Sequence, residues 1–196
     1  MKEIDIYDFD KTVIPFDSGS KFLFYCLLHN PWIIVCLPLQ VAGVIPYLLK
    51  LRNFTYAKNR LFCFIKLINL EKNVKGFWDK YESKVFDWFK PENRARYTVV
   101  ISASPDFLLE EICTRLKVDK LICTRHNSSN GTIIGLNCKG EEKVTRFYEV
   151  FDAARVIAVS SDSLKNDKPI FSLGERCFHV QKNGTRVEFD FNEKYI

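Results

Sequence analysis

Apolar and polar side chains alternate at the start of the chain, and short apolar runs separated by turn residues recur after residue 90. Residues 4–10 alternate between apolar side chains and aspartates, which predicts a short strand. Three later runs rich in β-branched side chains predict buried strands: 97–101, 120–124 and 155–159. Stretches with helical spacing lie between them: 105–116 and 141–151. This alternation predicts an α/β fold with a doubly wound, mostly parallel, Rossmann-like sheet.

Two further segments complete this pattern. Asn183-Gly184 lies between short apolar runs at 178–180 and 187–189, which predicts a C-terminal β-hairpin. Residues 17 to about 87 have a helical texture and separate the first strand from the second. We therefore expect a core of residues 1–16 and 88–196, with residues 17–87 inserted as a helical cap.

The insertion contains a long uncharged stretch. Phe22 to Leu49 is 28 residues without Lys, Arg, Asp or Glu. About 20 apolar residues can cross a bilayer, but one crossing would separate the first strand from the rest of its sheet. Two crossings need roughly 40 residues, and three prolines interrupt the stretch.

Two interpretations of this stretch remain open. The helices can pack against each other and over the active site. Alternatively, the cap can lie on anionic lipid as an interfacial segment with a basic fringe of four residues: Lys50, Arg52, Lys58 and Arg60.

Composition and charge narrow the class of protein. The 196 residues include 29 Lys plus Arg and 24 Asp plus Glu, and residues 17–87 hold the excess, with 10 basic against 5 acidic groups. No arginine-rich helix or Cys/His finger accompanies this charge, so we expect no nucleic-acid partner. The seven cysteines include no C-x-x-C pair, which disfavours a zinc site and a disulfide framework. We predict a cytoplasmic protein, with peripheral membrane association through the cap left open.

Polar residues at the predicted strand ends carry the candidate chemistry. Asp8 and Asp10 end the first strand, Ser102 and Ser104 the second, and Ser160 to Asp162 the last parallel one. The carboxyl ends of parallel strands meet at one edge of the sheet, so these residues should converge. An Asp carboxylate can attack phosphorus, a second carboxyl can act as acid and base, and Mg²⁺ suits clustered oxygen ligands.

The order of these residues resembles the four motifs of the haloacid dehalogenase superfamily. The motifs are Asp8-x-Asp10, then Ser102, then Lys143, then Ser161-Asp162-Ser163 with Asp167. Within that superfamily the chain is similar to the phosphoserine phosphatase-like group, subfamily IB, and to small bacterial members related to phosphatidylglycerophosphatase C. This resemblance implies that the helical insertion is a cap of the C1 type.

The resemblance implies a role for each matching residue. Asp8 would be the nucleophile and a Mg²⁺ ligand, and Asp10 the general acid and base, with its carbonyl on the metal. Ser102 would bind phosphate and Lys143 would neutralise it, with Lys139 as a rival. Three further residues are expected beside the substrate: Thr12, Asp17 and Ala103.

The last motif leaves one assignment open. Asp162 would bind the metal, and Asp167 would also belong to the metal shell or orient the lysine, with Asn166 or Ser163 as substitutes. Asp17 has a second interpretation as a helix N-cap.

The predicted function is a Mg²⁺-dependent phosphomonoester phosphatase that works through an aspartyl-phosphate on Asp8. Its substrate would be a small phosphorylated metabolite or a lipid phosphate. The alternatives are a phosphotransferase, or a non-catalytic module that binds membrane, lipid or protein on the same scaffold. Asp10 argues for phosphate chemistry, because the superfamily's dehalogenases lack this second acid.

Overall fold

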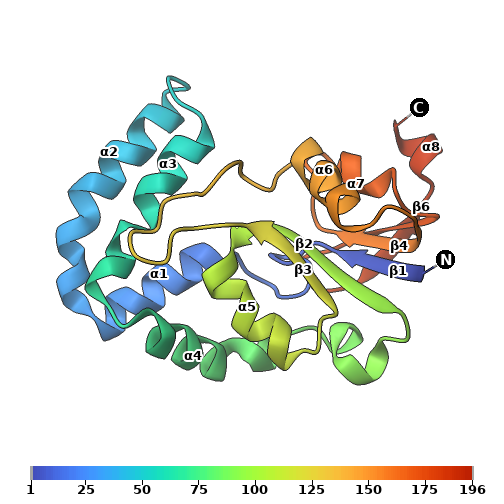
Figure 1. Cartoon of the computed structure of the whole chain (residues 1–196), viewed down its shortest axis with the longest axis horizontal. Helices are drawn as coiled ribbons and strands as arrows, with labels where there is room; N and C mark the ends of the chain where they lie inside the picture. The colour runs from blue at the N-terminus through green and yellow to red at the C-terminus, as the bar shows by residue number, and fades with distance from the viewer. Residues whose placement is uncertain (1, 196) are drawn as a thin grey trace.

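The computed structural model describes residues 2–195 and contains a six-stranded sheet, with a group of helices extending from one side of it (Figure 1). The strands are β1 (Lys2–Tyr7), β2 (Tyr97–Pro105), β3 (Lys120–Thr124), β4 (Ala154–Ser161), β5 (Arg176–Val180) and β6 (Arg186–Phe189). Their order is β3-β2-β1-β4-β5-β6, and β6 alone is antiparallel to its neighbour. The predicted α/β fold with a mostly parallel sheet and a C-terminal hairpin is confirmed.

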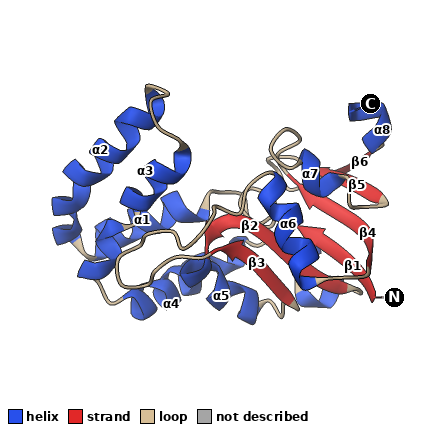
Figure 2. Ribbon diagram, turned by 45° about the horizontal axis from the view of Figure 1, so that its top comes forward, coloured by secondary structure: helices blue, strands red, loops and turns tan. Residues whose placement is uncertain are grey.

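Helices cover both faces of the sheet (Figure 2). On one face, α6 (Glu141–Val150) and α7 (Lys168–Phe171) pack on the alternate β1 side chains Ile4 and Ile6. On the other face, α5 (Asp106–Arg115) packs with Tyr7 of β1 and Val100 of β2. Because both faces are buried, the central strands have the near-continuous apolar runs that the sequence shows.

Four helices lie between β1 and β2, where the sequence predicts the helical insertion. They are α1 (Ser18–His29), α2 (Leu37–Leu48), α3 (Phe54–Leu61) and α4 (Leu70–Tyr81). Short 3₁₀ turns follow several of them, at Pro31–Cys36, Cys63–Leu67, Glu82–Lys84, Asp87–Phe89 and Pro91–Asn93. A final short helix, α8, spans Phe191–Tyr195.

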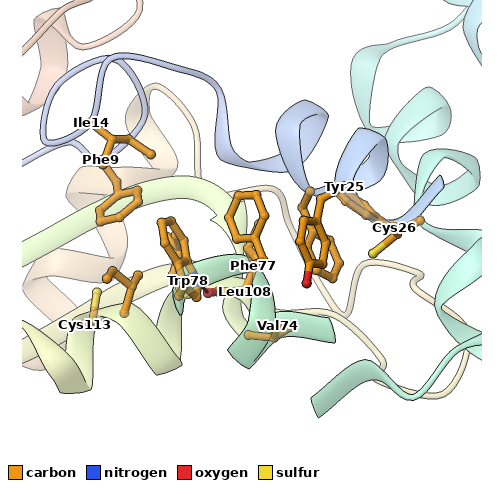
Figure 3. Packing of buried hydrophobic residues seen from close by; sticks show 14 of the residues in the cluster. Phe9, Ile14, Tyr25, Cys26, Val74, Phe77, Trp78, Leu108 and Cys113 are labelled. Carbon is orange, nitrogen blue, oxygen red and sulfur yellow. Dashed lines mark hydrogen bonds between the residues drawn. The ribbon is translucent and has the colours of Figure 1, made fainter. Parts of the chain in front are cut away.

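The insertion and the sheet share one hydrophobic core. Phe9, just after β1, packs edge-on against Trp78 of α4, with ring centroids 5.9 Å apart. Phe77 contacts both Trp78 (4.7 Å) and Tyr25 of α1 (5.7 Å), so one row of rings runs from the sheet into the insertion (Figure 3). The Trp78 indole also donates to the Leu108 carbonyl of α5 at 2.7 Å. Packing therefore fixes α1 and α4 against the strands.

The outer face of the insertion is exposed and apolar. Of the twenty large hydrophobic side chains exposed among residues 2–195, fourteen lie between Phe24 and Phe54. Pro31–Leu48 forms one continuous helical stretch that is long and apolar enough to span a membrane, with a mean hydropathy of 1.7, and only 22% of it is buried. The helix α2 packs against α3, but most of the apolar side chains of this stretch stay exposed.

A loop of residues 125–140 reaches from β3 out to the insertion before it returns to α6 (Figure 1). We call it the arm. Its Ile133 amide donates to the Asn59 side chain of α3 at 2.7 Å. Gly131, with φ +79°, lies so close to Phe62 that a Cβ would fall 2.3 Å from the Phe62 carbonyl oxygen. The insertion is thus bonded to the core at a point distant from its two chain connections.

The predicted basic fringe is only partly correct. Lys50 and Arg52 are exposed. Lys58 is 5% exposed and bonds to the core, so it is not available to lipid. The sequence pattern of a short helix predicts that its lysines face solvent, because it does not include their tertiary neighbours. The prediction for Lys58 was wrong for this reason.

Candidate active site

Asp8 and Lys143 form the centre of the cluster at the carboxyl edge of the sheet. Asp8 follows β1, and its amide donates to the Ser160 carbonyl of β4 at 3.0 Å. The Lys143 ammonium, near the start of α6, lies 2.8 Å from Asp8 Oδ1 and 2.7 Å from Asp167 Oδ1. All three side chains are buried. The structure therefore brings the predicted nucleophile and the predicted lysine together, whereas the rival Lys139 is exposed.

Burial and the attraction between opposite charges shift the pKa values of Asp8 and Lys143 in opposite directions. Burial raises the pKa of the Asp8 carboxyl, and the neighbouring Lys143 pulls it back down. Burial also disfavours the charged form of Lys143, but attraction to Asp8 and Asp167 outweighs burial and raises the pKa of the lysine. The lysine stays charged, and it stabilises the ionised form of a carboxylate that is otherwise costly to bury.

Asp10 has a different environment from Asp8. Its Oδ1 accepts from the Ser18 amide of α1 at 2.9 Å, and its Oδ2 accepts from the Ser104 hydroxyl. Burial, followed by repulsion from Asp17, raises the pKa of Asp10 to about 6. A carboxyl that titrates near neutral pH can both give and take a proton, as a general acid and base must.

Ser102 and Ala103 lie near the carboxyl end of β2, where its pairing with β3 is irregular. The Ser102 side chain is 2% exposed, and its Oγ accepts from the Ser104 amide at 3.1 Å. The Ala103 carbonyl accepts from the Lys58 ammonium and from the Thr124 hydroxyl, the latter at 2.7 Å. These contacts hold the end of β2 at the same edge as Asp8 and Asp10.

Thr12 lies between Asp8 and Asp162, and its hydroxyl does not face an open surface. Its hydroxyl lies 3.4 Å from Asp8 Oδ2 and 3.5 Å from Asp162 Oδ1, and it accepts from the Asp162 amide at 2.9 Å. The side chain is fully buried. The prediction that Thr12 contacts substrate does not fit this geometry, because its hydroxyl is already bonded inside the protein.

Asp167 supports the lysine. One of its oxygens pairs with Lys143, and the other accepts from the Ser161 hydroxyl. With both oxygens occupied, the residue fits the lysine-orienting role better than a metal-ligand role. The alternative residues, Asn166 and Ser163, bond to each other.

Asp17 is the N-cap of α1. Its Oδ1 accepts from the Ser20 amide at 2.8 Å, and the residue is exposed. The capping interpretation therefore describes its contacts. It also lies close enough to Asp10 to raise that residue's pKa.

The donor set suits a hard divalent cation. Asp8 and Asp162 converge on one hydroxyl, and burial, followed by repulsion from Asp167, raises the pKa of Asp162. Carboxylates that repel one another in this way favour a cation between them, and Mg²⁺ needs only one or two carboxylates. Within residues 2–195 no three His, Cys, Asp or Glu side chains form a metal-binding group, so the side-chain donors here are the carboxylates of Asp8 and Asp162.

Lys58 also belongs to this site, although its sequence pattern predicted a place in the basic fringe that faces lipid. It comes from α3, 45 residues before the Ala103 carbonyl to which it donates. No motif marks it, because its environment is made by the fold of the insertion and the arm.

Comparison with known proteins agrees with this arrangement. The sequence pattern of the haloacid dehalogenase-like hydrolases matches residues 6–172, which include every residue of the site. The chain belongs to that family. This hydrolase is 24% identical over 189 residues to the protein CicA of Caulobacter vibrioides, an alignment that covers 89% of this chain and 84% of CicA.

Solved structures share the fold at low sequence identity. A protein of unknown function from Bordetella pertussis Tohama I has a TM-score of 0.71 and 16% identity, covering 90% of this hydrolase and 89% of that chain. A phosphoserine phosphohydrolase-like protein from Francisella tularensis has a TM-score of 0.56 and 18% identity, covering 90% and 86%. At these identities the likeness describes the fold.

Proposed function

We propose that this hydrolase is a Mg²⁺-dependent phosphomonoester phosphatase that works through an aspartyl-phosphate on Asp8. One observation carries the proposal: the buried Asp8 carboxylate is held by Lys143, beside a second carboxyl, Asp10, whose pKa is raised to about 6. A nucleophile and a separate acid and base are what two-step phosphoryl transfer needs. Membership of the hydrolase family supports the same reaction class.

The chain's own residues account for both steps. Asp8 attacks phosphorus while the bond from phosphorus to the leaving oxygen breaks, and Asp10 gives its proton to that oxygen. Asp10 then takes a proton from water as the water oxygen attacks the aspartyl-phosphate, which releases inorganic phosphate and restores Asp8. Ser102 and Lys143 stabilise the negative charge of the phosphoryl oxygens during both transfers.

Asp8, Asp162 and the main-chain carbonyl of Asp10 would hold the Mg²⁺. The ion would supply positive charge to the phosphoryl oxygens and reduce the repulsion between the carboxylates. We propose that residues 17–87 act as the cap that selects the substrate, and that the chain lies in the phosphoserine phosphatase-like branch.

Release of phosphate from 4-nitrophenyl phosphate tests the reaction class. We expect turnover with Mg²⁺, no turnover with EDTA, and loss of turnover in Asp8→Asn, while Lys139→Met keeps it. Trapping of phosphate on the protein during turnover separates the aspartyl-phosphate route from direct attack by water. Transfer to an added alcohol in preference to water would identify a phosphotransferase instead. Vesicle binding by a wild type that turns over no phosphomonoester would favour the non-catalytic module.

We also propose that the substrate is a lipid phosphate and that the insertion rests on the membrane surface of the cytoplasm. The exposed apolar face between Phe24 and Phe54 supports this, since soluble surfaces seldom gather so many large apolar side chains. Lys50 and Arg52 adjoin it and would meet anionic head groups. Because β1 and β2 are paired neighbours, the helices between them leave and return on one side, as in a peripheral contact.

Sedimentation with lipid vesicles tests the membrane contact. The wild type should sediment with vesicles containing phosphatidylglycerol. High salt should release part of the bound protein, because salt weakens contacts between charges but not apolar contacts. Val35→Ser/Leu48→Ser should remain in the supernatant, because these side chains are 69% and 68% exposed. Val187→Ser, an exposed apolar position on β6, is the matched control and should sediment normally. A wild type that stays in solution with every vesicle composition contradicts the proposal.

A further inference from the structure

Lys58 has an unusual environment for a lysine. Its side chain is 5% exposed, yet its ammonium makes no ion pair with any carboxylate among residues 2–195. It donates instead to two neutral oxygens, the Ala103 carbonyl and Asn137 Oδ1, the latter at 3.0 Å. Burial lowers its pKa to about 8, while attraction to Asp10 works in the opposite direction. A buried charge facing only neutral oxygens is costly, and such costs concentrate at functional sites.

The two contacts of Lys58 join three parts of the protein. Lys58 belongs to α3 of the insertion, Ala103 to the carboxyl end of β2, and Asn137 to the arm that leads to α6 and Lys143. The Thr124 hydroxyl at the end of β3 lies within hydrogen-bond distance of the same two oxygens, at 2.7 and 2.9 Å. Lys58 is therefore the member of this network that the insertion contributes.

The peptide group that Lys58 holds also contacts the phosphate-binding serine. The carbonyl of Ala103 and the amide of Ser104 belong to one planar peptide unit. The Lys58 ammonium donates to the oxygen of this peptide unit, and the N–H of the same unit donates to Ser102 Oγ at 3.1 Å. Because Ser102 Oγ accepts this bond, its own proton points elsewhere and is available to a phosphoryl oxygen.

We propose that Lys58 is a positioning residue that orients the Ser102 hydroxyl through the peptide group between Ala103 and Ser104, and so couples the insertion to the reaction at Asp8. The proposal rests on the phosphatase function proposed above. The Lys58 ammonium donates to the carbonyl oxygen and so polarises the whole peptide unit. This polarisation strengthens the hydrogen bond that the N–H of the unit donates to Ser102. Contact of the insertion with the core would then set the geometry of phosphate binding.

A double-mutant cycle between Lys58 and Ser102 tests the proposal. kcat and KM are measured with 4-nitrophenyl phosphate and Mg²⁺ for wild type, Lys58→Met, Ser102→Ala and the double variant. We expect Lys58→Met to lower kcat/KM at least tenfold, mainly through kcat, but to change it less than threefold when Ser102 is already alanine. Lys66→Met, an exposed lysine of the same insertion, is the matched control and should stay within twofold of wild type.

Each other outcome overturns the proposal. An equal loss in both backgrounds would mean that Lys58 acts independently of Ser102, and a loss expressed as raised KM in both would assign it to direct substrate contact. Wild-type kcat in Lys58→Met would remove any role. If the double variant turns over too slowly, the same cycle is evaluated from the inhibition constant of orthovanadate.

Two checks keep the cycle interpretable. Thermal unfolding shows whether Lys58→Met folds; if it does not, Lys58→Gln replaces it, and Lys58→Arg should recover part of the lost kcat because it keeps the charge. Failure of the wild type to hydrolyse any phosphomonoester would overturn the proposed function together with this inference. An active wild type with additive variants overturns the inference alone.

Discussion

Replacing Lys143 by methionine should destabilise the protein strongly. The ammonium lies 2.8 and 2.7 Å from carboxylate oxygens of Asp8 and Asp167, and the three side chains are 3%, 10% and 4% exposed. At an effective dielectric constant of about 20, each contact is worth about 6 kcal/mol before desolvation is subtracted. Loss of one partner from such a buried group costs about 3–5 kcal/mol, because carboxylates stay behind without a counter-charge.

Urea unfolding in EDTA at pH 7.5, followed by tryptophan fluorescence, measures this loss. EDTA is needed because a bound cation would replace the missing positive charge. The expected fall corresponds to a decrease in Tm of about 6–20 °C for a chain of this length. Lys139→Met, a change of the same type at an exposed lysine four residues earlier, should leave stability unchanged within about 0.5 kcal/mol.

A second variant decides whether the penalty comes from the stranded charge. Lys143→Met/Asp167→Asn removes one of the two carboxylates that the lysine served, so it should be more stable than Lys143→Met alone. A double variant that is no more stable than the single one would refute the electrostatic reasoning and leave lost packing as the cause. Both variants should have lost phosphatase turnover.

Three further predictions concern the periphery of the site. Burial lowers the pKa of His126 to about 4 from 6.5, so the unfolded chain binds the extra proton and the contribution of His126 to stability should fall by about 3 kcal/mol as pH drops from 6.5 to 4. The raised pKa of Asp10 acts in the opposite direction over this range, so the contribution is measured as the difference between wild type and His126→Phe in urea titrations. Gly131→Ala should cost about 2–4 kcal/mol because its Cβ would meet the Phe62 carbonyl, whereas Gly135→Ala, at φ +77° with open space around it, should cost about 1 kcal/mol. Asp17→Ala should lower Tm through loss of about 1 kcal/mol of capping, and Asp17→Ser should restore it; a loss of activity in both with unchanged Tm would instead indicate substrate contact.

The strands could be predicted from sequence because their patterns are local. The β-branched run at 97–101 predicts a strand, and Asn183-Gly184 predicts a hairpin turn, from only a few adjacent residues. The convergence of Asp10 with Ser104 was also predictable, since parallel strands place their carboxyl ends at one edge. These inferences needed only periodicity and a rule of topology.

Other features depended on contacts between distant segments. The uncharged stretch from Phe22 to Leu49 has apolar residues on all sides of its helices, so its pattern does not distinguish a buried face from an exposed one. Lys58 and Thr12 look like exposed and substrate-facing residues until the arm and β4 are placed beside them. The tertiary neighbours, not the residue types, decide their environment.

The central position of β1 has a consequence for how the chain folds as it is made. Ile4 pairs with Tyr97 and with Val156, so β1 waits for partners that are made 93 and 152 residues later. At about 5–20 residues per second, β1 is without β2 for roughly 5–20 s. The apolar segment from Phe24 to Phe54 emerges during that interval, before the sheet beneath it exists. On the nascent chain this segment is therefore without the sheet for longer than its own helices take to form.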